Sequence, residues 1–276
     1  MKKEDSAAEL CTRSPVPTAA LRLKCRSSQR KADRSIVGIA IRNIGDTSLI
    51  GTSIVPLSFP RNLLFLFGSC CTHSPQWVRM KFEEVVLKRR MFRNFQVKPV
   101  PRDVIDCILA FAQHAPSAGF SQGWAYVVVT APEMRKKVGD VQGENDYYAN
   151  RRFHKFVSEA PVLIVACVSE RLYHDRYREP DKLREDGTEI EWSVPFWYFD
   201  IGCACMLIFL AAVNEGLAAA FTGVFQTDRM RGLLGIPEHF HPVGVISIGY
   251  PSKDVRSPSL RRGRKSFQDI VHHERW

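Results

Sequence analysis

The sequence predicts one domain of mixed α and β structure from residue 80 onward, either α+β or mixed α/β. Segments with helical spacing alternate irregularly with β-branched runs, and residues 161–168 are apolar throughout, as in a central buried strand. The chain of 276 residues is long enough to bury a sizeable core. Its apolar content of 45% and charged content of 25% are those of an ordinary globular protein.

Two helices are expected at the start of this domain. Phe82, Val85 and Val86 mark one face of a helix that we expect to run over residues 80–95. After an extended, proline-containing run, apolar residues at helical spacing predict a second helix over residues 102–114.

Strands and helices then alternate to the end of the domain. Pro132 begins a basic amphipathic helix, and Gly216 is expected to end a later helix that is rich in small residues. The same reasoning predicts strands over residues 124–130, 161–168, 217–224 and 243–249, and helices over residues 132–138, 201–215 and 229–234.

Residues 169–193 are strongly charged and include Pro180 and Gly187, which predicts an exposed excursion or lid. Aromatic residues crowd together over residues 192–199 directly after it. These rings either pack in the core or form the wall of a substrate cavity.

The loop between the second helix and the first strand carries unusual chemistry. Pro116 fixes φ, Gly119 permits positive φ, and Ser117 offers a hydroxyl for local or outward hydrogen bonds. Small residues flanked by aromatic ones allow backbone groups to approach a flat polar ligand, although an ordinary turn has a similar composition.

Two basic clusters frame the domain. The first comprises Arg89, Arg90 and Arg93, and the second comprises Arg262 and Arg264. Each cluster alone is typical of a solvated charged face. Both together, with the small-residue loop between them in sequence, favour a phosphorylated planar cofactor, because arginine supplies planar, always-charged donors.

Residues 1–79 differ in composition from the rest of the chain. They hold 12 Lys and Arg against 5 Asp and Glu, so +7 of the net charge of +10 lies there. Their apolar pieces are broken by Pro, Gly and Arg, and we expect a basic, poorly ordered extension. Scattered basic residues without an aromatic platform make nucleic acid an unlikely partner.

The origin of this extension has three interpretations. It lacks the apolar region of a secretory signal, and Glu4, Asp5 and Glu9 argue against a transit peptide. We favour the third interpretation, in which the natural chain begins at Met80.

Cysteine usage predicts a reduced, cytoplasmic compartment and no metal site. The eight cysteines contain no CxxC pair and no zinc-type spacing. The longest uncharged apolar run, residues 203–213, is far shorter than a membrane span, so no membrane partner is expected.

Five sequence blocks in order resemble the FMN-dependent nitroreductase family, over residues 80–276. They are Arg89-Arg90-Met91-Phe92-Arg93-Asn94-Phe95, Ala115-Pro116-Ser117-Ala118-Gly119-Phe120-Ser121-Gln122-Gly123-Trp124, Asp200-Ile201-Gly202-Cys203-Ala204, Gly216-Leu217 through Phe221-Thr222-Gly223-Val224, and Ser259-Leu260-Arg261-Arg262-Gly263-Arg264. The resemblance implies an α+β fold in which helices flank a central, mostly antiparallel sheet. It also implies a homodimer with FMN at the subunit interface.

The resemblance further assigns roles to residues of these blocks. The two arginine clusters would hold the FMN phosphate and the polar edge of the flavin. The loop would line the cofactor, from the partner subunit, and backbone N–H groups at the end of the third strand would face the flavin N5 edge. The implied cofactor-binding residues are Arg89, Arg90, Arg93, Pro116, Ser117, Ala118, Gly119, Gln122, Thr222, Gly223, Arg262 and Arg264.

The implied reaction is ping-pong hydride transfer. NAD(P)H, as co-substrate, would reduce the flavin at N5, and a nitro-aromatic compound, quinone or similar small-molecule acceptor would then take the hydride. The cofactor carries the chemistry, so no catalytic side chain is assigned.

Two departures from the family pattern bear on the substrate. Met91 stands where many members have Ser, and Phe120 stands where many have Asn, which makes Phe120 a candidate substrate-binding residue. Two alternatives therefore stay open. One is a related flavoenzyme that dehydrogenates or dehalogenates a specific metabolite, and the other is a non-catalytic protein that binds flavin or nucleic acid.

Overall fold

The structure is a computed structural model that describes residues 80–149 and 155–276. The predictions made for residues 1–79 lie outside the described residues.

Four strands form one sheet in the order β1-β2-β4-β3, and every neighbouring pair is antiparallel. The strands are β1 (Trp124–Val129), β2 (Val162–Val168), β3 (Ala218–Gly223) and β4 (His241–Gly249). All four predicted strands are confirmed within one or two residues of their ends. The α+β class and the antiparallel sheet are also confirmed.

β2 is buried on both faces because it lies between two neighbours and under helices on each side. Alternate residues of β2 enter different cores, as the two-residue period of a strand requires. Ile164 and Val168 belong to one core, and Leu163 and Val165 belong to the other.

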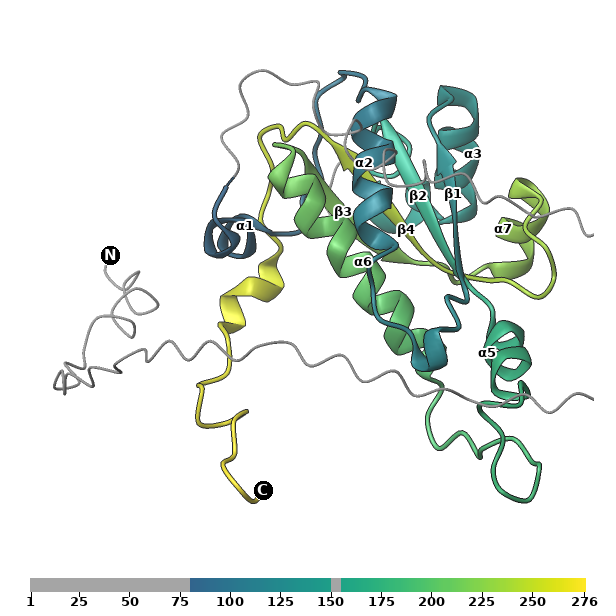
Figure 1. Cartoon of the computed structure of the whole chain (residues 1–276). Coiled ribbons are helices and arrows are strands. Elements are labelled where there is room, and N and C mark those ends of the chain that lie inside the picture. Colours follow the sequence, from purple (N-terminus) through teal and green to yellow (C-terminus); the bar gives the residue numbers. More distant parts are fainter. Residues whose placement is uncertain (1–79, 150–154) are drawn as a thin grey trace, which may run out of the picture. The chain divides into compact units, whose positions relative to one another are not determined.

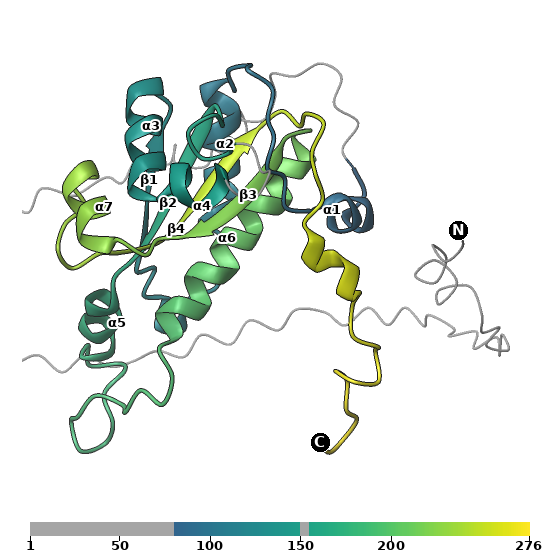
Figure 2. The ribbon, with the colours of Figure 1, turned by 180° about the vertical axis from the view of Figure 1, so that it is seen from behind.

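Helices cover the two faces of the sheet. Figure 1 shows α2 (Arg102–Ala112) and α6 (Phe196–Asn214) on one face, and Figure 2 shows α3 (Pro132–Val141), α4 (Glu144–Ala149) and α7 (Thr227–Leu234) on the other. The helix α1 (Phe82–Lys88) contacts α6, and the helix α5 (Glu170–Tyr177) contacts the short 3-10 turn η2 (Ala118–Phe120). The second 3-10 turn, η3 (Pro258–Arg262), lies on the C-terminal tail, away from the sheet.

The first predicted helix is wrong over its second half. α1 ends at Lys88, and Arg89 is already extended, with φ −62° and ψ 119°. Met91 bridges Ala219 of β3, and Phe95 bridges Pro251 after β4. Pairing with the edge of the sheet therefore overrides the helical propensity of this basic run.

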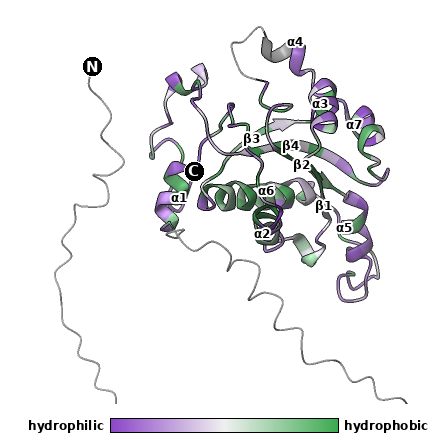
Figure 3. Ribbon diagram, turned by 90° about the horizontal axis from the view of Figure 1, so that it is seen from above, coloured by the Kyte–Doolittle hydropathy of each residue, from purple (hydrophilic) through white to green (hydrophobic). Residues whose placement is uncertain are grey.

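α6 begins five residues earlier than the sequence predicts, at Phe196, with Pro195 as its N-cap residue. Gly216 follows its end with φ 70°, which confirms the expected stop. By length and apolar composition alone α6 could cross a membrane, but half of this stretch is buried within the fold. Figure 3 shows it hydrophobic along nearly all its length, which core packing against α2 and the sheet explains.

The cysteines of the core are small hydrophobic residues. Cys107, Cys167 and Cys205 are buried. Burial raises the pKa of Cys167 and of Cys205 to about 12, so both thiols stay protonated at neutral pH.

Candidate functional site

The loop over residues 116–122 follows an unusual backbone path. Gly119, Phe120 and Gln122 have positive φ angles of 59°, 57° and 50°. For Phe and Gln this region costs roughly 1–2 kcal/mol each, so it persists only where the surroundings hold it. The path favours a ligand-binding loop over an ordinary turn.

Asp200 of α6 anchors this loop. Its side chain is 3% exposed, and its Oδ2 atom accepts hydrogen bonds from the Ala118 N–H and the Tyr173 hydroxyl, each at 2.8 Å. Burial and then the bond to Asp200 raise the pKa of Tyr173, so its hydroxyl remains a donor. Two helices, α5 and α6, thus fix one end of the loop through buried polar groups.

The loop also holds itself together. The Gln122 N–H donates to Ser117 Oγ at 3.0 Å, and Ser121 Oγ donates to the Ala118 carbonyl at 2.6 Å. The aromatic ring of Phe120 receives no such support and is 72% exposed. A predicted substrate-binding ring therefore projects from a firmly held backbone.

The charged excursion is only partly what the sequence predicts. Tyr173, in its first part, is fully buried and joins the core, whereas the other residues of α5 are exposed or half-buried. Beyond α5, Glu189 fastens the excursion: its Oε1 accepts a hydrogen bond from Trp192 Nε1 at 2.7 Å and lies 2.5 Å from His174 Nδ1. Its Oε2 pairs with Arg178 Nε at 3.0 Å.

The aromatic residues after the excursion divide between the two interpretations. Trp197 is buried and packs against Tyr173 and Trp192, as the core interpretation predicts. Phe196 and Phe199 are exposed, by 40% and 65%, so core packing does not account for them.

The first arginine cluster lies in the extended segment over residues 89–95. Asp254, whose side chain is 1% exposed, accepts hydrogen bonds from Arg90 Nη1 at 2.8 Å and from the Arg93 N–H at 3.3 Å. The Arg90 guanidinium also lies 3.4 Å from the centre of the Phe92 ring. Arg90 is therefore fixed within its own chain, and Arg89 is half-buried beside it.

The second arginine cluster lies on the C-terminal tail. Arg262 ends η3 and Arg264 follows it, and both are exposed. Figure 1 shows this tail extending away from the sheet on the side of α1. That Arg262 and Arg264 bind the same phosphate group as Arg89 stays a prediction.

Thr222 and Gly223 end β3 opposite Val245 and Gly244 of β4. The Gly223 carbonyl accepts a hydrogen bond from Gln142 Nε2 at 3.2 Å, which ties this strand end to the end of α3.

Within one chain, the loop and the first arginine cluster lie at opposite ends of α6. Ala118 is bonded to Asp200 in the N-terminal part of α6, whereas the Phe92 N–H donates to the carbonyl of Ala219, just beyond its C-terminal end. From Asp200 to Asn214 the helix rises about 21 Å. Within one chain, most of the length of α6 therefore lies between the loop and the first arginine cluster.

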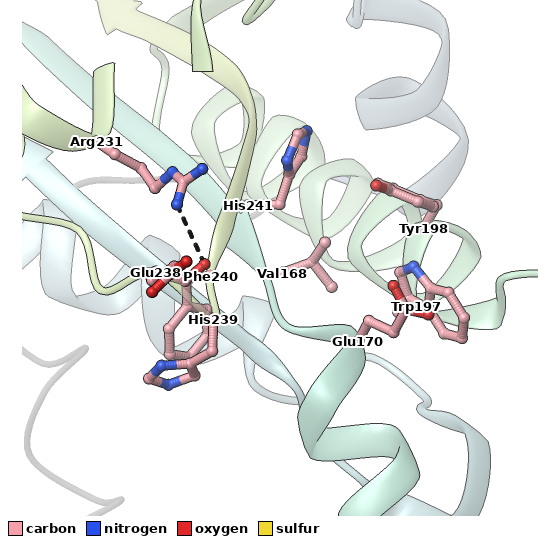
Figure 4. A pocket seen from close by; sticks show the side chains of 9 residues that line it. All are labelled: Val168, Glu170, Trp197, Tyr198, Arg231, Glu238, His239, Phe240 and His241. Atoms are coloured by element: carbon pink, nitrogen blue, oxygen red, sulfur yellow. Dashed lines mark hydrogen bonds between the residues drawn. The ribbon is translucent and has the colours of Figure 1, made fainter. Parts of the chain in front are cut away.

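A separate pocket of about 200 Å³ lies where the end of β2 meets the starts of β4 and α6 (Figure 4). Arg231 spans one side of it, with its Nη1 donating to the Glu238 carbonyl at 3.3 Å. The lining mixes both signs of charge and comprises Val168, Glu170, Trp197, Tyr198, Arg231, Glu238, His239, Phe240 and His241. It contains none of the predicted cofactor-binding residues, but it includes Trp197 and Tyr198 from the aromatic group over residues 192–199. Among the residues that the structure describes, no three His, Cys, Asp or Glu side chains gather as a metal site requires.

Sequence reasoning missed the residues that position the site. Asp200 was used only as part of a matching block, yet a lone carboxylate inside an apolar helix is itself a signal of a buried hydrogen-bonded group. Asp254 gave no such signal, because it lies in a polar tail.

The model of the nitroreductase family matches residues 86–250, which is more than half of the chain. A protein of Methanothermobacter thermautotrophicus, provisionally named NADH dehydrogenase/NAD(P)H nitroreductase, is 32% identical over 202 residues, covering 72% of this chain and 89% of the relative. Iodotyrosine deiodinase 1 of Rattus norvegicus is 29% identical over 205 residues, covering 71% of each chain.

Solved structures show the same fold. NfrA1 of B. megaterium superposes with a TM-score of 0.57 at 21% identity, covering 71% of this chain and 74% of that one. A nitroreductase family protein of Streptococcus pneumoniae gives a TM-score of 0.54 at 23% identity, covering 70% and 99%. The chain therefore belongs to the nitroreductase family of flavin-dependent oxidoreductases.

Proposed function

We propose that the protein is an FMN-dependent enzyme that passes a hydride from NAD(P)H to an electrophilic small molecule, such as a nitro-aromatic compound or a quinone. The observation that carries this proposal is the extent of the family match. It covers residues 86–250 and so includes the first arginine cluster, the loop and the end of β3.

The residues present fit a flavin mononucleotide in their chemistry. Arg89 and Arg93 are four residues apart in a segment that begins extended at Arg89 and bridges the sheet at Met91, and residues four apart on an extended chain share one side. Within the cluster, Arg90 is paired with Asp254. Guanidinium groups bind phosphate through paired N–H donors.

The other predicted residues would bind and orient the cofactor. The loop over residues 116–122 would present its fixed backbone to the ring, and Gly223, held by Gln142, would fix the N–H groups at the end of β3. FMN, when bound, supplies the two-electron chemistry. The exposed Phe120 ring would lie over the substrate side and exclude water there.

We also propose that the working unit is a homodimer. The loop and the first arginine cluster of one chain are separated by most of the length of α6, so a complete site needs the loop of a second copy. α6 offers a surface for that copy, since Phe199 and Met206 expose 65% and 45% of their area.

A second candidate is reductive dehalogenation of an aromatic substrate. It is supported by the 29% identity to rat iodotyrosine deiodinase 1, which extends over 71% of both chains. Phe120 stands where many family members have Asn, so an aromatic ring replaces an amide beside the proposed flavin site. This replacement bears on the choice between the two candidate reactions.

Titration of the purified full-length chain with FMN, followed by flavin fluorescence, tests the shared part of both candidates. We expect one FMN per chain and at least about tenfold weaker binding in an Arg89→Ala/Arg93→Ala double variant, because charged hydrogen bonds to phosphate are lost. Arg171→Ala on α5 is the matched control, since the Arg171 side chain is 70% exposed and forms an ion pair with Asp175 of the same helix.

The acceptor is then identified by assay. Oxidation of NADPH that depends on a quinone or a nitro-aromatic compound supports the first candidate. Iodide release from iodotyrosine, without quinone turnover, supports the second. A chain that binds no FMN overturns both.

A further inference from the structure

One guanidinium group joins two segments that are more than fifty residues apart in sequence. Arg176 Nε donates to the Gly119 carbonyl of the loop at 2.9 Å. Its Nη1 and Nη2 atoms donate to the two carboxylate oxygens of Asp181, both at 2.7 Å, and Nη1 also donates to Glu179 at 2.8 Å. The Arg176 side chain is only 22% exposed, so it lies against the protein along its length.

The contact falls on the strained part of the loop. Gly119 and Phe120 both have positive φ. A Cβ atom at Gly119 would lie 2.6 Å from the ring of Tyr177, so α5 also closes against this glycine. The loop conformation is therefore supported by α5 from one side and by Asp200 from another.

We propose that Arg176 is a positioning residue that couples the excursion after α5 to the loop over residues 116–122. While Asp181 is paired with Arg176, it holds the guanidinium in the orientation in which Nε donates to the Gly119 carbonyl. When the excursion shifts, the loop loses a charged donor. The relevance to cofactor binding depends on the proposed function, whereas the coupling itself does not.

The geometry explains why arginine occupies this position. A bidentate pair fixes both the distance and the plane of the guanidinium, and the Nε atom remains free to donate elsewhere. A lysine ammonium is a point charge on a flexible stem and does not impose that plane. The Asp181 side chain is 60% exposed. Salt therefore screens the Arg176–Asp181 ion pair more than it screens the buried hydrogen bonds that Asp200 accepts.

The bond to Arg176 lowers the pKa of Asp181 to about 2, so the pair stays charged throughout the neutral range. Proton uptake by Asp181 therefore does not break the link at neutral pH.

Hydrogen exchange measured by mass spectrometry on the full-length chain, without added FMN, tests the coupling. The Phe120, Ser121 and Gln122 amides report on the loop, because each is hydrogen-bonded inside it. We expect Arg176→Gln to accelerate their exchange about tenfold, the size of one hydrogen bond to a charged group. We expect Asp181→Asn, which changes no direct contact of the loop, to accelerate it about threefold.

Two controls separate coupling from general loosening. Arg171→Gln breaks a surface pair on the same helix and should leave loop exchange unchanged. Raising the salt concentration should accelerate loop exchange more in the unsubstituted protein than in Asp181→Asn, where only the pair with Glu179 remains to be screened. In addition, the conservative variant Arg176→Lys should keep only part of the protection.

Each alternative outcome overturns the proposal. If Arg176→Gln accelerates exchange of the loop amides but Asp181→Asn and salt do not, Arg176 supports the loop independently of the excursion. If Arg171→Gln acts equally, α5 is destabilised as a whole. Protection of the same amides by added FMN in the unsubstituted protein is measured separately, so failure of the proposed cofactor site is distinguishable from failure of the coupling.

Discussion

The two ends of α6 are organised by different kinds of contact. At its N-terminal end, Asp200 and Tyr173 are buried and hold the loop through side-chain hydrogen bonds. At its C-terminal end, the arginine cluster is placed by backbone pairing of Met91 and Phe95 and by the tail that carries Asp254. A loop that keeps a strained shape is fixed by buried side-chain hydrogen bonds, whereas the arginine segment is fixed by backbone bridges together with one buried carboxylate, Asp254.

The largest loss of stability is expected when the side chain of Asp200 is removed. Asp200→Ala leaves the Ala118 N–H and the Tyr173 hydroxyl without their acceptor, and we expect the free energy of unfolding to fall by about 3 kcal/mol. Urea unfolding measures this change.

Asp200→Asn is the matched control for that substitution. Both donors bond to Oδ2, so an amide oxygen in its place accepts both, and we expect a loss of about 1 kcal/mol. Equal losses in the two variants would show that the charge, rather than the two hydrogen bonds, holds the loop.

A smaller effect is expected at the other end of α6. Asp254→Ala removes one acceptor from Arg90 and from the Arg93 N–H, while the backbone bridges remain, so we expect a loss of about 1–2 kcal/mol. Asp228→Ala, which breaks an exposed pair with Arg231, should cause no measurable change. A loss as large as that of Asp200→Ala would remove the distinction between the two ends.

The smallest expected effect concerns strain in the loop. Asn tolerates positive φ better than Phe does, and the Phe120 ring is mostly exposed, so Phe120→Asn should raise stability by about 0.5–1 kcal/mol. Thermal unfolding measures this gain. Phe225→Asn provides the control, because Phe225 is 90% exposed without a positive φ, and an equal gain there would exclude backbone strain as the cause.

The sequence predicted the parts of the fold that depend on local pattern. The apolar run over residues 161–168 became β2, and Pro132 and Gly216 mark a helix start and a helix end where expected. Helical propensity failed over residues 89–95, because the partner of that segment is a strand edge more than 120 residues later. Such pairing leaves no trace in a local window.

The candidate site was predicted less completely than the fold. Arginine identity pointed to a phosphate, but sequence did not show that Arg90 is already paired with Asp254. Tyr173 was hidden among charged neighbours in the excursion, although its ring is fully buried. The roles of Asp200 and Arg176 depend on contacts across 82 and 57 positions, which only the folded chain brings together.

The strand order has a consequence for synthesis. β4 is the last strand to leave the ribosome, yet it occupies a central place between β2 and β3. Until residue 249 has emerged, the nascent polypeptide therefore holds two sheet edges with no neighbour, and a product shortened before His241 would lack the strand that unites them. The emergence of β4, rather than of any earlier strand, is the point at which this protein closes its sheet.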